Sequence, residues 1–185
     1  MPSAGQVRIG LSYRPPLVFV QSFLIMRSKE QLRFATTHRR GPRPKTTPTN
    51  PHTQLDQNAP AHLQAALFDH AGSLAGVRVG ESGVSVPGAR AFHLDNIQTV
   101  KRDAFLVERE FAHLHPPYDG SLHAALPPQL VQTAIDNGWA ELHPLAGRFG
   151  LPSNIVMIYG PRDAEELSIV TELVNLSHAY ATGVV

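Results

Sequence analysis

The chain has 185 residues, of which 42% are apolar and 17% are charged, and its formal net charge is +1. This composition is typical of a soluble globular protein with a single well-filled core, and it excludes a disordered chain. Because the sequence has no cysteine, a disulfide scaffold, a thiolate metal site and a thiol nucleophile are all excluded.

The charges are unevenly distributed along the chain. Residues 1–50 carry nine Lys/Arg and one acid, whereas residues 51–185 carry seven Lys/Arg and fourteen Asp/Glu. A basic arm therefore precedes an acidic body, and such arms bind nucleic acid or anionic membranes in some proteins. A solvated leader explains the same pattern more simply. Since no aromatic RNA-binding signature accompanies the charges, we expect no nucleic-acid partner.

One strongly apolar run, LVFVQSFLIM (17–26), lies near the start of the sequence. It is too short to span a bilayer, which takes about 20 residues. It has the form of a signal-peptide core, but no small-residue cleavage site follows it. We expect a cytoplasmic protein without a firm membrane span, with weak membrane association through 17–26 as one alternative. Translation from Met26 would remove the run altogether.

Residues 39–60 contain five prolines and no apolar periodicity. Proline removes a backbone donor and disfavours helix at the residue before it. The pattern predicts an extended or disordered arm over residues 1–55 and a folded domain over residues 56–185.

The first part of the domain is predicted to contain a helix and short strands. Apolar residues recur at three- and four-residue steps over 59–74, which indicates a helix with Asn58 as its N-cap and a stop at Gly76. The stretch 83–95 alternates around a Pro-Gly break and predicts two short strands. Residues 96–107 have no clear preference.

The second part of the domain has stronger signals. Strands are predicted at 108–115 and 121–126, joined as a hairpin by a five-residue loop. The pattern then predicts a helix over 127–138, a buried strand over 154–160 and a long helix over 162–183 with a capping-box-like start. The order of these elements indicates a small α+β domain with a mainly antiparallel sheet packed by about three helices.

The hairpin carries histidines at alternate positions. If the loop closes with His115 opposite Ser121, then His113 lies opposite His123, roughly 5 Å away across the ladder. Because alternate residues of a strand point to opposite faces, one face would carry the histidines and the other would be apolar. Phe111 and Ala125 would share the histidine face, while a slip of one residue would move His123 to the other face.

Three interpretations of these histidines remain open from spacing alone. His113, His115 and His123 could bind a metal ion, with His143, Asp119 or Glu141 as further ligands. A histidine could instead act as a general base, since its ordinary pKa of about 6.5 suits proton abstraction at neutral pH. The third interpretation is a wet polar surface without chemistry. No other cofactor is predicted.

Four further residues are candidates for substrate binding. Trp139 is the only tryptophan and could form one wall of a site for a flat aromatic ligand, although a tryptophan is more often part of the hydrophobic core. Tyr118 and Asp119 lie in the hairpin loop, where they could orient substrate or a histidine, or could simply be turn residues. Arg162 could hold a carboxylate or enolate, or could lie at a surface helix start.

Three sequence blocks, EREFAHLHPPYDGSLHAAL, GWAELHPLAG and IYGPRDAEELSIV, resemble in order and spacing those of the luciferase-domain family. This family includes the luciferases of bioluminescent fungi and many bacterial and fungal relatives. The resemblance covers about residues 40–183. It implies an oxygenase-like pocket for a flat, enolisable aromatic molecule, because fungal luciferases add dioxygen to 3-hydroxyhispidin without nicotinamide or flavin.

The resemblance also implies roles for the histidines. His113, His115, His123 and His143 fall on the matching blocks. One of His113 or His123 would take the enol proton, and the others would bind the enolate oxygens or a metal. The implied partners are dioxygen and a small phenolic, pyrone-like or polyketide-like substrate. The loop PPYDG departs from the fungal luciferases, so light emission is not implied.

Overall fold

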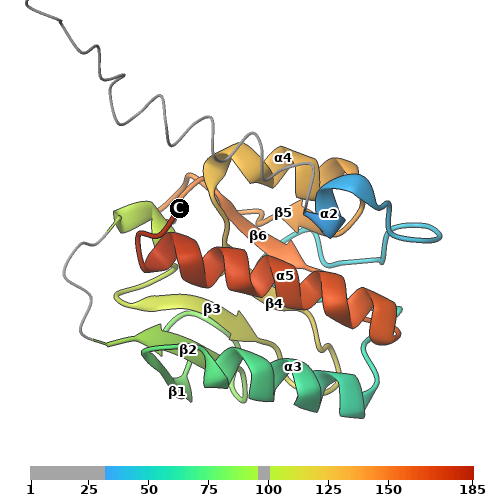
Figure 1. The fold of residues 1–185 in the computed structure, drawn as a ribbon, viewed down its shortest axis with the longest axis horizontal. Helices are drawn as coiled ribbons and strands as arrows, with labels where there is room; N and C mark the ends of the chain where they lie inside the picture. The colour runs from blue at the N-terminus through green and yellow to red at the C-terminus, as the bar shows by residue number, and fades with distance from the viewer. Residues whose placement is uncertain (1–31, 96–100) are drawn as a thin grey trace, which may run out of the picture.

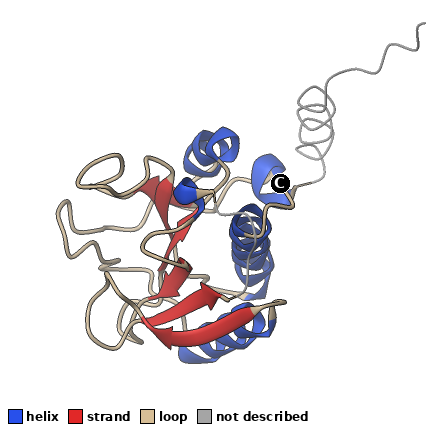
Figure 2. Ribbon diagram, turned by 90° about the vertical axis from the view of Figure 1, so that its left-hand side faces the viewer, coloured by secondary structure: helices blue, strands red, loops and turns tan. Residues whose placement is uncertain are grey.

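The computed structural model describes residues 32–95 and 101–185 of the chain. The apolar run 17–26 and the alternative start Met26 lie outside the described residues. A six-stranded antiparallel sheet forms one layer, and helices cover one of its faces while loops cover the other (Figure 1 and Figure 2). The predicted α+β class with a mainly antiparallel sheet is confirmed.

The sheet has the strand order β1-β2-β3-β4-β6-β5. The strands are β1 (Val77–Glu81), β2 (Arg90–Leu94), β3 (Glu110–Leu114), β4 (Leu122–Ala125), β5 (Ala140–Leu142) and β6 (Ile155–Ile158). The helices are α2 (Arg33–Thr36), α3 (Ala61–Ser73), α4 (Pro128–Asp136) and α5 (Ala164–Ala181), with a 3₁₀ turn η1 (Arg102–Ala104). Within residues 32–95 and 101–185, no helix combines the length and the apolar character needed to cross a membrane.

The predicted helices and hairpin are found with small changes at their ends. The N-cap of α3 is Pro60 rather than Asn58. The Asn58 side chain instead donates to the backbone carbonyl of Asp119, at 2.9 Å, and so ties the start of α3 to the hairpin loop. Only the second of the two strands predicted over 83–95 is found, as β2; its partner β1 lies before that stretch, and residues 82–89, where the first strand is predicted, form the loop that joins them.

The long helix α5 begins as its sequence predicts. The Asp163 Oδ1 atom accepts the backbone N–H of Glu166 at 2.9 Å, which satisfies one of the free amides of the first turn. Ile169, Leu173 and Val174 of this helix are buried against the sheet. The core lies between α5, α3 and the strand residues that face them.

Replacing Asp163 with alanine should lower the free energy of unfolding by about 1 kcal/mol, because the cap of α5 is lost. Thermal or urea unfolding measures this, and Asp163→Asn is the matched control because asparagine caps equally well. The hydrogen bond from the Glu166 amide and the charge of Arg40 lower the pKa of Asp163. The cap's contribution should therefore be complete above the ordinary pKa of 3.8 and fall as the pH drops through the lowered folded value. Equal stability of the alanine and asparagine variants at pH 7 would contradict this assignment.

The expectation that Phe111 shares the histidine face is wrong. A β-bulge between Phe92 and His93 interrupts the pairing of β2 with β3. A bulge inserts one residue and reverses the alternation of side chains beyond it. Phe111 therefore points into the core, where its ring lies 6.4 Å from that of Phe92, and Glu110 takes the place on the polar face.

The arm is also more closely joined to the domain than the boundary near residue 56 predicts. Phe34 is fully buried in the core, and Arg39 forms an ion pair of 3.4 Å with Glu166 in α5. The backbone N–H of Gly160 donates to Gln54 Oε1 at 2.9 Å. The stretch from 37 to 58 is mainly irregular, as its prolines predict, but its side chains anchor it to the sheet and to α5.

Candidate active site

The hairpin of β3 and β4 positions the histidines of the site, and its predicted register is confirmed. His113 pairs with His123, and the backbone N–H of His115 donates to Ser121 O at 2.9 Å. Ala112, Leu114, Leu122 and Ala124 point into the core on the helix side of the sheet. The histidines lie on the other face, beneath the loops.

His113 of β3 and His115, which directly follows β3, each have their own carboxylate. His113 Nδ1 donates to Glu110 Oε1 at 2.6 Å, and Glu110 is also held by Ser82 Oγ at 2.8 Å and the Gly83 amide at 2.9 Å. His115 Nδ1 donates to Asp119 Oδ2 at 2.7 Å. These contacts direct Nε2 of both rings toward His123, whose Nδ1 lies 3.1 Å from each of them.

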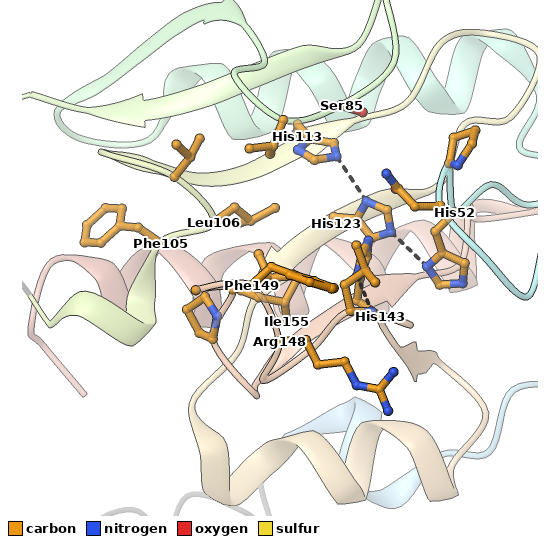
Figure 3. Close-up of a pocket in the computed structure, with 18 of the residues that line it drawn as sticks. His52, Ser85, Phe105, Leu106, His113, His123, His143, Arg148, Phe149 and Ile155 are labelled. Carbon is orange, nitrogen blue, oxygen red and sulfur yellow. Dashed lines mark hydrogen bonds between the residues drawn. The ribbon is translucent and has the colours of Figure 1, made fainter.

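His123 has a second partner on its other side, and this partner comes from the arm. His52 Nδ1 lies 3.1 Å from His123 Nε2, and His52 Nε2 contacts Glu141 Oε1 at 2.7 Å (Figure 3). Tyr159 OH donates to the remaining oxygen of Glu141 at 2.9 Å. A buried chain of polar groups therefore runs from the hairpin through the arm to β5 and β6.

His143 lies at the edge of this group. Its ring centroid is 4.6 Å from that of His123 and 5.3 Å from that of His52. His143 Nδ1 accepts the backbone N–H of Leu145 at 3.1 Å, and this histidine has no carboxylate partner within the described residues. Two groups of three histidines thus share His123: one with His113 and His115, the other with His52 and His143.

The three carboxylates of the site are kept ionised by their partners. Burial alone would raise the pKa of Glu110, but the hydrogen bond and charge of His113 outweigh burial and leave that pKa below its ordinary value. For Asp119, His115 and the Ser121 hydrogen bonds likewise overcome burial and lower the pKa. Glu141 behaves in the same way, with His52 as its main partner.

The surroundings of three of the imidazoles disfavour the charged form. Burial is the largest cause that lowers the pKa of His113, and the pairing with Glu110 offsets it only in part. Burial and then the neighbouring histidines hold the pKa of His123 well below its ordinary value. Burial and His52 lower the pKa of His143 to about 4. Neutral imidazoles retain a lone pair that can accept a proton or bind a metal.

The histidines form one wall of a cavity of about 740 Å³. This volume is in the usual range for sites that enclose a small organic ligand. Apolar side chains, including Leu106 and Ile155, form much of the remaining wall, and Phe149 lies at the mouth with 92% of its surface exposed (Figure 3). The lining comes from the arm and from loops that follow β1, η1 and β5, at residues 50–52, 84–86, 105–108 and 148–152.

Some of the predicted substrate-binding residues lie away from the cavity. Trp139 is buried in the core, where its Nε1 donates to Thr37 O at 2.7 Å, so it does not wall the site. Arg162 binds Glu166 and donates through Nη1 to Gln57 Oε1 at 2.9 Å, which ties the arm to α5. Tyr118 is 67% exposed at the tip of the hairpin loop.

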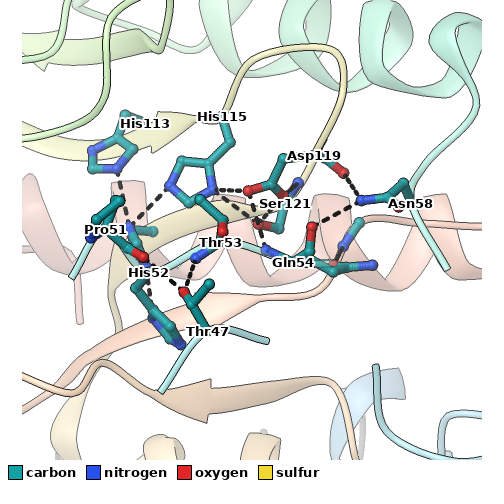
Figure 4. A network of polar contacts seen from close by, with 12 residues as sticks. Thr47, Pro51, His52, Thr53, Gln54, Asn58, His113, His115, Asp119 and Ser121 are labelled. Atoms are coloured by element: carbon teal, nitrogen blue, oxygen red, sulfur yellow. Dashed lines mark hydrogen bonds and ion pairs between the residues drawn. The ribbon is translucent and has the colours of Figure 1, made fainter. Parts of the chain in front are cut away.

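Asp119, in contrast, is fully buried and orients a histidine. Besides His115, it accepts the Ser121 amide at 2.9 Å, Ser121 Oγ at 2.6 Å and the Gln54 amide at 3.1 Å (Figure 4). This arrangement holds the hairpin loop and the arm together around one carboxylate.

Sequence reasoning missed His52, Glu110 and Phe149. His52 lies in the proline-rich arm and is 71 residues away from His123 along the chain, so no local pattern connects them. The signal for Glu110 was present, because it precedes His113 by three residues, but strict alternation placed it on the opposite face. Phe149 lies in an irregular loop that carries no periodic signal.

Most residues of this site lie in a part of the chain that is similar to known proteins. Residues 108–177, which contain the hairpin, Glu141, His143 and most of α5, match the family model of the luciferase domain. This part of the chain resembles the luciferase-domain family.

The chain is also similar to curated fungal proteins. Those named luciferase from Armillaria gallica and Armillaria mellea are each 37% identical to it over 100 residues. The luciferase from Neonothopanus nambi is 35% identical over the same length. Each alignment covers 53% of this chain and 36% of the relative, so the match spans about a third of the relatives' length. No solved structure matches the chain.

Proposed function

We propose that this protein is a luciferase-like oxygenase that acts on a flat, enolisable phenolic or pyrone-like molecule. One observation carries the proposal: in a chain that resembles the luciferase-domain family, buried imidazoles form the polar wall of a cavity that is otherwise largely apolar. An apolar cavity with a few fixed polar groups is the usual form of a site for a small organic ligand. Catalytic groups on strands are also held more precisely than groups on loops.

The proposed chemistry uses the histidines in their neutral form. The lowered pKa values of His113 and His123 favour the neutral rings, which retain a lone pair. One of these two imidazoles would take the enol proton, and the neighbouring rings would hold the enolate oxygens. Glu110 would fix His113 when that ring takes the proton, and Asp119 would fix His115 as it holds an enolate oxygen. The electron-rich enolate would then react with dioxygen.

Oxygen uptake by the purified full chain tests this proposal. We expect consumption of dioxygen when 3-hydroxyhispidin or a related hydroxypyrone is added, with light recorded separately because emission is not required. Binding of the pyrone without oxygen uptake would instead indicate a non-catalytic ligand-binding domain. Neither binding nor uptake across a panel of phenols and pyrones would contradict the proposed function.

Phe149 gives a prediction about substrate affinity. Its exposed ring at the cavity mouth is placed to stack on a flat substrate, and aromatic pairs contribute about 0.5–1.5 kcal/mol. Phe149→Ala should therefore raise KM roughly 2- to 10-fold and change kcat little. Steady-state oxygen uptake measures both, and Phe149→Tyr, which keeps the ring, should behave like the parent protein. An unchanged KM in the alanine variant would show that the ring does not contact substrate.

A further inference from the structure

The protons of three histidines are fixed by the carboxylates beside them. A carboxylate only accepts hydrogen bonds, so His113 Nδ1 and His115 Nδ1 must carry their protons toward Glu110 and Asp119. A neutral imidazole has one N–H, and therefore Nε2 of both rings presents a lone pair. Both lone pairs point at the same atom, His123 Nδ1, which lies 3.1 Å from each.

The position of the proton on His123 is fixed by its contact with His52 of the arm. His52 Nε2 donates to Glu141, so a neutral His52 accepts through Nδ1. His123 Nε2 is then the donor across their 3.1 Å contact, and its Nδ1 is left with a lone pair. Three lone pairs, from His113, His115 and His123, would face one another without a proton among them.

An additional proton does not resolve this arrangement. A single extra proton, on His123 Nδ1 or on Nε2 of either other ring, would supply only one N–H among the three nitrogens. Either His113 Nε2 or His115 Nε2 would still lack a donor, since the described residues place no other donor beside these atoms. Buried polar atoms without partners are costly, so both states point to a cation that all three nitrogens can share.

The distances match a metal ion. A histidine nitrogen lies about 2.0–2.1 Å from a bound zinc ion, so neighbouring ligand nitrogens on a tetrahedral or octahedral ion lie about 2.9–3.4 Å apart. His123 Nδ1 lies 3.1 Å from each of the other two nitrogens, and all three nitrogens lie within 4.8 Å of one another. Carboxylates on the far nitrogens of His113 and His115 supply the outer contacts that orient metal-binding histidines.

We propose that His113 Nε2, His115 Nε2 and His123 Nδ1 together bind one divalent transition-metal ion. Imidazole ligands favour zinc, iron, copper or nickel over calcium or magnesium, which prefer oxygen ligands. Three protein ligands leave a coordination position free for a small molecule from the cavity. The metal site stands on the ring geometry, whereas its role rests on the proposed function. With an ion bound, His113 and His123 would be its ligands, and the ion rather than a free imidazole would polarise the enol and hold the enolate oxygen.

The second group of histidines is a poorer site. His143 Nδ1 accepts the Leu145 amide at 3.1 Å, so the proton of a neutral His143 is on Nε2 and no lone pair remains for an ion. His143 therefore serves as the matched control for the ligands: it lies in the same cluster and is buried, but it is assigned no contact with the metal.

Metal titration of the full chain, purified without an affinity tag and freed of metal with a chelator, tests the site. Co²⁺ is followed by its visible absorption and Zn²⁺ by calorimetry. We expect one ion per chain and a loss of affinity of roughly 100-fold or more in His113→Ala and His115→Ala, against less than about threefold in His143→Ala and in the surface variant His62→Ala. Removing an outer carboxylate with Glu110→Ala should weaken binding about 10- to 100-fold.

The outcomes separate the metal site from the proposed function. Circular dichroism first establishes that each variant is folded. Absence of binding at one ion per chain in the folded parent protein would overturn the metal site. Full affinity in His115→Ala, or loss of binding in His143→Ala alone, would overturn the assigned triad. Metal binding without oxygen uptake on any phenol or pyrone would leave the metal site standing and contradict the oxygenase.

Discussion

His123→Ala is expected to lower the rate of oxygen uptake at least about 100-fold, because this ring occupies the centre of the site. Both of its nitrogens are engaged, Nδ1 with His113 and His115 of the hairpin and Nε2 with His52 of the arm. The substitution therefore removes both of these contacts. It also breaks the chain of hydrogen bonds that joins His113 and His115 through His52 to Glu141. Steady-state oxygen consumption at saturating substrate measures the loss.

The His123→Ala variant should remain folded, since its ring contacts other histidines that keep their own carboxylate partners. His62→Ala on the exposed face of α3 is the control for loss of a histidine and should retain the parent rate. Turnover by His123→Ala at close to the parent rate, with an unchanged thermal midpoint, would show that the cluster takes no part in the reaction.

Asp119→Ala is expected to cause the largest loss of stability, roughly 3–5 kcal/mol in the free energy of unfolding. This carboxylate is fully buried and accepts four hydrogen bonds, from His115, Gln54 and both the amide and hydroxyl of Ser121. Without it, these buried donors lose their acceptor, and a buried donor left unpaired costs about 1–3 kcal/mol.

Urea unfolding and the thermal midpoint measure this effect, and the midpoint should fall by roughly 6–20 °C. Tyr118→Ala is the matched control, because it changes the neighbouring residue of the same loop at an exposed position. The Tyr118 variant should stay within about 0.5 kcal/mol of the parent protein. Similar midpoints for the two variants would contradict the structural role of Asp119.

Local patterns determined much of the hairpin and of α5. The five-residue loop between the strands correctly predicts that His113 faces His123, because loop length fixes the register of a hairpin. The start of α5 is equally local, since Asp163 caps an amide three residues ahead of it. Such features depend on neighbours in sequence, so composition and spacing are sufficient to predict them.

The tertiary structure determined which other residues join the histidines of the hairpin to form the site. His52 reaches His123 from an arm without periodicity, and its place depends on contacts such as Arg39 with Glu166 that no local pattern encodes. A bulge opposite Phe92 and His93 exchanged the positions of Glu110 and Phe111, which strict alternation assigns the other way. Contacts between distant segments, and irregularities in a strand pair, depend on the packing of the whole domain. That packing placed Glu110 beside His113 and Glu141 beside His52, whereas Asp119 reaches His115 within the hairpin loop.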